Sequence, residues 1–248
     1  MGIYSDHLSR EVRLERMRPA EVDQARQEQP AIYVPFGSIE WHGYHNPVGL
    51  DAIKAHEQLV GLAVRSGGVV YPPVFFGSGG GHLEWPHTYM VSSDPMVSVV
   101  SQLLMGFEKK GYRKTILLSG HYPNRSEYLD QAISAYTAKA GKMAVLALVE
   151  NQIPHGLGDH AAKYETSFML YLHPETVDGE ALRGDGKPVA AETSFLSEQV
   201  INWMGEEYRQ HPCYGLVGID PRQTANRQLG QEMTNNLLDF LQSWLERS

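Results

Sequence analysis

Short, continuously apolar runs alternate with amphipathic stretches along this chain, and this alternation constrains the fold more than any other feature. Apolar runs with the length of buried strands lie at residues 31–36, 69–76, 115–118 and 143–149. Apolar residues at helical spacing lie at residues 53–65, 95–111, 126–140 and 230–247. This order predicts an α/β fold with a mostly parallel sheet, whose ligands bind beyond the carboxyl ends of the strands.

The composition excludes several classes of function. The 248 residues carry a net charge of -8 and contain no block of Lys or Arg, which argues against nucleic acid or an anionic membrane as partner. Cys213 is the single cysteine, so no intrachain disulfide forms and a reducing compartment is expected. No apolar run approaches the ~20 residues of a membrane span, and the first residues lack the apolar core of a signal peptide. We therefore expect one soluble, cytoplasmic domain spanning residues 1–248.

Side chains that can bind a metal follow three of the predicted strands. Glu40 and His42 follow the first strand, and on an extended backbone they point the same way. Asp51 opens the next helical stretch, where a carboxylate is favoured. His82 and His121 follow the second and third strands. A hydrogen-bonded polar strand end is the alternative, but the coincidence at several strand ends favours a site for a divalent metal.

A glycine run at residues 77–81 follows the second predicted strand and raises the question of a phosphate site at the same edge of the sheet. It could form a phosphate-binding loop, but neither a Gly-Lys-Ser/Thr sequence nor a helical stretch follows it directly. A loop at the mouth of the site, which a ligand or another backbone can approach closely, is the favoured interpretation.

Four segments, in order and at matching spacing, resemble the motifs of one protein family. They are Gly37-Ser38-Ile39-Glu40-Trp41-His42-Gly43 with Asp51 eleven residues after Glu40, Gly120-His121-Tyr122-Pro123-Asn124, His160 followed by Glu165-Thr166-Ser167, and the stretch from Tyr214 to Arg222. Together they resemble the creatininase (creatinine amidohydrolase) family of metal-dependent hydrolases. The resemblance implies a three-layer α/β/α sandwich, often a homohexamer, with two divalent metals bridged by water or hydroxide.

The resemblance also implies a ligand set. Glu40, Asp51 and His121 would hold one metal, and His42 with the shared Asp51 would hold the second. Creatininase takes its last carboxylate from the position where this chain has Pro123, and Glu165 is the substitute that we expect. Zn²⁺ suits these mixed ligands best, and Mn²⁺ or Fe²⁺ would also fit.

The same resemblance assigns catalytic and substrate-binding roles. His160 is the expected general acid, with Asp159 as a partner for its other ring nitrogen, and Glu165 completes the catalytic set. Tyr122 and Trp85 are candidates for the pocket wall, although both could equally be ordinary packing aromatics. His82 and Asp159 are the remaining candidates for contact with substrate. His87 departs from the family, since glycine is usual at that position.

These features predict a dinuclear amidohydrolase that cleaves a non-peptide C–N bond of a small cyclic amide, of creatinine or lactam type. Two metals would activate a bridging hydroxide and stabilise the oxyanion of the tetrahedral intermediate. A hydrolase of linear formamides or small peptides is the alternative within the family. A non-catalytic homologue that binds a metal or ligand is the alternative outside enzymes, motivated by Pro123 and by the unusual Ala162-Lys163 pair.

Overall fold

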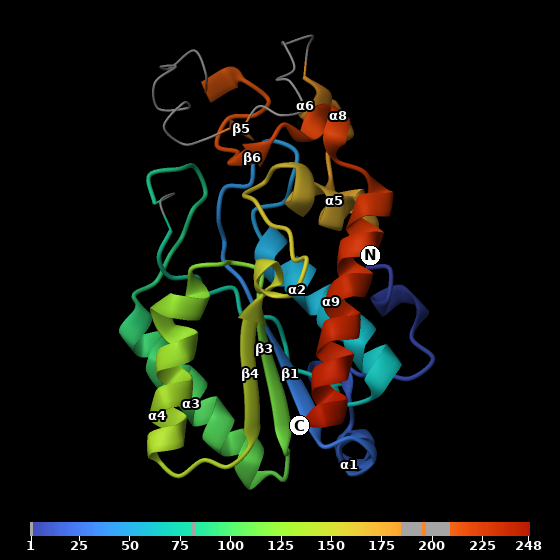
Figure 1. The fold of residues 1–248 in the computed structure, drawn as a ribbon, viewed down its shortest axis with the longest axis vertical. Coiled ribbons are helices and arrows are strands. Elements are labelled where there is room, and N and C mark those ends of the chain that lie inside the picture. The colour runs from blue at the N-terminus through green and yellow to red at the C-terminus, as the bar shows by residue number, and fades with distance from the viewer. Residues whose placement is uncertain (1, 81–82, 185–194, 197–208) are drawn as a thin grey trace.

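A parallel sheet of four strands, in the order β2-β1-β3-β4, forms the middle layer of the fold (Figure 1). The computed structural model describes residues 2–80, 83–184, 195–196 and 209–248. The strands are β1 (Ala31–Phe36), β2 (Val69–Val70), β3 (Lys114–Ser119) and β4 (Ala144–Val149). β1 pairs with β3 along its whole length, and β3 pairs likewise with β4. Their carboxyl ends therefore meet at one edge of the sheet.

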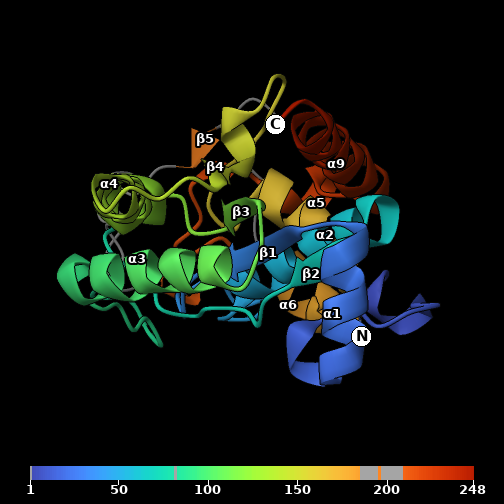
Figure 2. The ribbon, with the colours of Figure 1, turned by 90° about the horizontal axis from the view of Figure 1, so that it is seen from below.

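Helices cover both faces of this sheet (Figure 2), which confirms the predicted α/β sandwich. On one side lie α2 (Leu50–Ser66), α5 (Lys163–Leu172) and α9 (Arg227–Arg247), and on the other lie α3 (Ser93–Lys109) and α4 (Asp130–Ala138). Each side has its own apolar core, and alternate residues of β1 enter opposite cores: Tyr33 packs with α2 and α9, whereas Val34 packs with α3 and α4.

Shorter elements complete the described chain. Three further helices are α1 (Pro19–Glu28), α6 (Gly179–Arg183) and α8 (Pro221–Thr224), and β5 (Phe195–Leu196) pairs antiparallel with β6 (Gly218–Ile219). Single helical turns are η1 (Ser5–His7), η2 (Leu14–Arg16), η3 (Arg125–Leu129, of π type), η4 (Glu150–Gln152) and η5 (Pro174–Thr176). Among the described helices, none has the length and apolarity that a membrane span requires.

The predicted long helices and three of the strands are confirmed to within a few residues, but the second strand is much shorter than expected. The continuous ladder with β1 is limited to Val69 and Val70, because the two prolines that follow lack the N–H that a ladder needs. Val74 returns to the sheet as an isolated bridge to Phe36.

Two glycines let the first turn of α2 approach the strand ends closely. A Cβ atom on Gly37, directly after β1, would lie 2.1 Å from the backbone nitrogen of Ala52. A Cβ atom on Gly120, directly after β3, would lie 2.2 Å from the carbonyl oxygen of Asp51. Because only glycine fits at such distances, these two positions bring Asp51 to the carboxyl edge of the sheet.

Candidate metal centre

Titratable side chains from four separate segments meet beyond the carboxyl ends of β1 and β3. Five of them are almost completely buried, and His160 is half-buried. The group consists of Glu40, His42, Asp51, His121, His160 and Glu165. The structure thus brings together every residue to which the sequence assigned a metal ligand or a proton-transfer role.

The first set of three donors joins Glu40, Asp51 and His121, whose ligand atoms lie within 4.8 Å of one another. Nδ1 of His121 lies 2.8 Å from Oε2 of Glu40 and 3.4 Å from Oδ2 of Asp51. Two carboxylates and one imidazole in such proximity are a suitable donor set for a divalent cation.

The second set joins His42, Asp51 and Glu165 and uses the other oxygen of the aspartate. Nε2 of His42 lies 3.2 Å from Oδ1 of Asp51 and 3.7 Å from Oε2 of Glu165. Asp51 thus contributes one carboxylate oxygen to each set. Its Oδ2 also accepts a hydrogen bond of 2.6 Å from the hydroxyl of Ser38, which fixes the orientation of the carboxylate.

The imidazole of His42 is oriented as a metal ligand would be. Its Nδ1–H donates to the backbone carbonyl of Glu40 at 3.0 Å, which leaves Nε2 as the nitrogen that faces the carboxylates. This buried Nε2 has no well-oriented hydrogen bond with any described residue. Two carboxylate oxygens near a nitrogen without a proper hydrogen bond are the arrangement that a cation would complete, so the residues fit a metal.

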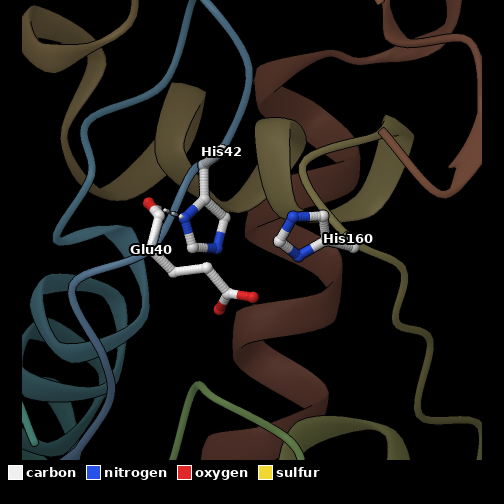
Figure 3. A group of neighbouring side chains, drawn as sticks. All are labelled: Glu40, His42 and His160. Carbon is white, nitrogen blue, oxygen red and sulfur yellow. Dashed lines mark hydrogen bonds between the residues drawn. The ribbon is translucent and has the colours of Figure 1, made fainter. Parts of the chain in front are cut away.

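His160 approaches the same group from a different part of the chain (Figure 3). Its ring lies 4.7 Å from the ring of His42, and its Nε2–H donates to the carbonyl of Trp41 at 2.9 Å. The backbone of His160 is paired in both directions with Val217, at 2.8 and 2.9 Å. The C-terminal segment and the loop after β1 therefore hold this histidine beside Glu40 and His42.

Asp159 has a role that the sequence did not predict. Its two carboxylate oxygens accept hydrogen bonds from the backbone N–H groups of Tyr164 and Glu165, at 2.8 and 3.0 Å. These N–H groups belong to the first turn of α5, so the carboxylate caps that helix. The hydrogen bond of His160 to the carbonyl of Trp41 uses one of its ring nitrogens, and the pairing of the other with Asp159 stays a prediction.

Electrostatic coupling within the cluster displaces several pKa values. Burial would raise the pKa of Glu40, but His160 and His121 hold it down to about 2. Burial would lower the pKa of His42 and of His121, but the surrounding carboxylates raise these values to about 9 and about 10. Without metal, these shifts favour positive charge on His42 and His121 and negative charge on Glu40 and Asp51.

A buried lysine that was not predicted from the sequence lies beside this cluster. Lys54 is fully buried, and its Nζ lies 2.8 Å from Oε1 of Glu165 and 3.0 Å from Oε2 of Glu150. Although burial favours the neutral amine, Glu150 and Glu165 hold the pKa of Lys54 above its ordinary value. The signal was available: Lys54 lies one helical turn after Asp51, on the face of α2 that points inward.

A cavity of about 240 Å³ opens onto the cluster. The described residues that line it are Glu40, Asp51, Gly80, Gly120, His121, Tyr122, Pro123, Asp159, His160 and Glu165. Tyr122 and Asp159, two of the residues expected to contact substrate, both line this cavity, and their role toward a substrate stays a prediction. A larger groove of about 670 Å³ lies between α1 and α3, but it is mostly apolar and none of the cluster residues line it.

The other two residues expected to contact substrate, Trp85 and His82, are not among the described residues that line this cavity. Trp85 is half-exposed and stacks on Tyr214, with ring centroids 4.7 Å apart, outside the residues that line the cavity. His82 lies outside the described residues.

Comparison with known proteins shows a match over most of the chain. Residues 15–245 match the family described as Creatininase, creatinine amidohydrolase. The chain is 29% identical to creatinine amidohydrolase of Pseudomonas putida over 173 residues, which cover 59% of this chain and 66%, just under two thirds, of that protein. It is 25% identical to 3-dehydro-scyllo-inosose hydrolase of Thermotoga maritima, over 97% of this chain and 82% of that protein.

A peptidase is also similar to this chain. It is the mycofactocin precursor peptide peptidase of Mycolicibacterium smegmatis, 24% identical over 87% of this chain and 85% of that protein. Among solved structures, a crystal structure of creatininase superposes with a TM-score of 0.76 at 21% identity, covering 96% of this chain and 98% of that one. A manganese form of creatininase has a TM-score of 0.75 at 20% identity, with the same coverage.

Proposed function

This chain belongs to the creatininase family, and from that premise we propose that it is a dinuclear metal-dependent amidohydrolase acting on a small cyclic amide. The members of the family to which it is similar are hydrolases by name. The bond that we propose it cleaves is a non-peptide C–N bond, of creatinine or lactam type.

The observation that carries this proposal is the position of Asp51 between two sets of donors. Its Oδ1 faces His42 and its Oδ2 faces His121, at 3.2 and 3.4 Å from their ring nitrogens. A carboxylate with one oxygen toward each of two donor sets is suited to bridge two cations. We infer that Glu40 and His121 complete one metal site and that His42 and Glu165 complete the other.

Two divalent cations, when bound, would lower the pKa of a water molecule and polarise a carbonyl group. Zn²⁺ is the metal that we propose, with Mn²⁺ and Fe²⁺ as further candidates, because the donors are carboxylates and imidazoles. Forms of creatininase with manganese and with zinc, named as such, support the choice of metals.

The residues of the chain supply the remaining steps. We infer that His160 delivers the proton to the departing nitrogen, since it borders the cavity and its ring is held against Trp41. The wall of the cavity next to the cluster includes Tyr122, whose ring would exclude water from one side of a bound substrate. A volume of about 240 Å³ lies below the range usual for drug-sized ligands, which favours a compact ring over an extended peptide.

The test begins with the metal content per chain of the purified protein and of Glu165→Gln. We expect about two metals per chain in the wild type and about one in the variant. Glu57→Gln is the matched control, because Glu57 is equally buried but accepts hydrogen bonds from the backbone of Tyr4 and Ser5, away from the cluster. Two metals in all three proteins would remove Glu165 from the proposed ligand set.

A substrate panel then tests the reaction. It contains creatinine, other lactams, N-formyl compounds, short peptides and 3-dehydro-scyllo-inosose, each assayed with metal supplied. Ring opening of a cyclic amide supports the proposal, whereas release of formate or of an amino acid favours the linear-amide alternative. Fewer than one metal per chain and no hydrolysis on the whole panel would favour a non-catalytic binding protein.

We further propose that the chain is a single domain over residues 1–248, that it assembles as a homohexamer and that it is located in the cytoplasm. The assembly follows from family membership, and light scattering coupled to size exclusion tests it. Cell fractionation tests the location.

A further inference from the structure

Lys54 is a buried cation to which the proposed function assigns no role. It lies one turn after Asp51 on α2, and its Nζ is 2.8 Å from Oε1 of Glu165 on the first turn of α5. The other oxygen of that carboxylate, Oε2, accepts a hydrogen bond of 2.7 Å from the backbone N–H of Ala161. Oε2 is also the oxygen that faces His42, at 3.7 Å from its Nε2. The carboxylate is therefore held at both oxygens, and Oε2 is directed at the donor cluster.

The surroundings of Lys54 leave its ammonium group little freedom. The Nζ atom lies 5.6 Å from the ring centroid of Tyr122 and 5.5 Å from that of Phe168. Glu150, directly after β4, contacts it at 3.0 Å. Both carboxylates and the lysine are at most 2% exposed, so water cannot substitute for any partner. A cation confined in this way is a fixed donor, unlike a lysine on a surface.

The charges of Lys54 and of its carboxylate neighbours determine how this lysine can affect metal binding. A lone ammonium next to a metal site would repel the metal, which would weaken binding. Here Glu150 supplies a second carboxyl group to the same ammonium, and when ionised it offsets the charge of the lysine. Burial raises the pKa of Glu150 to about 7. The main contribution of Lys54 is therefore directional: it holds Oε1 so that Oε2 stays aimed at His42.

We propose that Lys54 is a positioning residue that orients Glu165 as a ligand of the second metal. This inference rests on the proposed function, since it concerns the ligand set of the same cluster. The first donor set, Glu40 with His121, makes no contact with Lys54 among the described ion pairs. The lysine should therefore govern one of two metal sites and leave the other unchanged.

The experiment is a Co²⁺ titration of the metal-free protein, followed by visible absorption and by calorimetry. The variant is Lys54→Met combined with Glu150→Gln, which removes the fixed donor from Glu165 and keeps the formal net charge of the buried group unchanged. We expect two binding events in the wild type. In the variant we expect one event of unchanged affinity and a second weakened tenfold or more, the range seen when an outer partner of a metal ligand is lost. The spectrum of the second event should also change, because its ligand set is altered.

Two further variants make the result decisive. Glu57→Gln, also on α2, controls for loss of a buried polar contact and should retain both events. If the methionine variant does not fold, Lys54→Gln combined with Glu150→Gln keeps polar groups at both positions and still removes the ammonium group that contacts Glu165.

The outcomes separate this inference from the proposed function. Two events of wild-type affinity in the double variant would overturn the role of Lys54 and leave the dinuclear proposal intact. Equal weakening of both events would also overturn it, because that result indicates a general loss of structure. A wild-type protein that binds no Co²⁺ would overturn both proposals together.

Discussion

The carbonyl of Trp41 accepts a hydrogen bond of 2.9 Å from Nε2–H of His160. Trp41 lies between two candidate ligands in the sequence, so the loop that carries Glu40 and His42 also orients the candidate acid. The two residues are 119 positions apart. Any shift of this loop would therefore move the candidate ligands and the candidate acid at the same time, which would couple metal binding to proton transfer in the proposed mechanism.

Replacement of His160 by glutamine should separate metal binding from proton transfer. If His160 is the general acid, kcat falls by about 10²- to 10⁴-fold, because the leaving nitrogen must depart without a proton. Metal content per chain should stay at the wild-type value, since both donor sets of the proposed ligands remain. His155→Gln is the control, as His155 is exposed on the same loop. A variant that loses metal together with activity would instead make His160 a ligand.

Asp51→Ala should remove both metals, because this residue is shared by both donor sets. The methyl group of alanine offers no oxygen to either set. We expect metal content near zero and a loss of activity of about 10³-fold or more. Elemental analysis of the dialysed variant measures the first quantity. Retention of one full metal per chain would contradict the bridging role.

Asp159→Asn tests the cap on α5. The amide can accept only one of the two backbone hydrogen bonds, so we expect the free energy of unfolding to fall by about 1 kcal/mol. Urea denaturation measures that loss. The pH dependence of kcat should keep the limb assigned to His160, because the hydrogen bond to Trp41 orients that ring. Loss of the limb would restore the pairing of Asp159 with His160 that the sequence suggested.

The metal-free protein should lose stability as the pH rises. The pKa values of His42 and His121 are raised from 6.5 to about 9 and about 10. A raised pKa stabilises the folded state fully below the unfolded value of 6.5, and the contribution disappears as the pH passes the folded value. We therefore expect the Tm of the protein in chelator to fall between about pH 7 and pH 10.

The metal-loaded protein is the control for this fall of Tm with rising pH. Metal ligation keeps both imidazoles neutral in the folded state, so the same fall should be absent. A Tm of the metal-free protein that stays level or rises over this pH range would contradict the coupling between these histidines and the carboxylates.

Much of the fold could be predicted from the sequence, because strands and helices depend on local patterns. Apolar runs such as residues 115–118 and helical spacing such as residues 95–111 reappear within a few residues of their expected bounds. The second strand was the exception, since two prolines interrupt an otherwise apolar run. The candidate ligands could also be predicted from the sequence, because residue type and spacing in the motifs restrict them to a few positions.

The roles of Asp159 and Lys54 could not be predicted with the same success. Asp159 precedes His160, which suggested a pair, and this pair stays a prediction. The cap that Asp159 forms on α5 depends on where the chain turns into that helix, which residue spacing does not reveal. Lys54 was absent from the expected site, because a lysine in an amphipathic helix is normally solvated. Its buried position depends on how α2 packs against α5 and on the position of Glu150 after β4.

The sequence by itself determined the order of strands and helices, the membership of one family and the residue types that can bind a metal. These are properties of local pattern and of motif spacing, which the chain carries before it folds. Only the tertiary structure decided that Asp51 faces two donor sets, that Trp41 orients His160 and that Lys54 holds Glu165. Each of these relationships brings together separate segments of the chain, and Gly37 and Gly120 contribute to the position of Asp51 because they let α2 pack closely against the ends of β1 and β3.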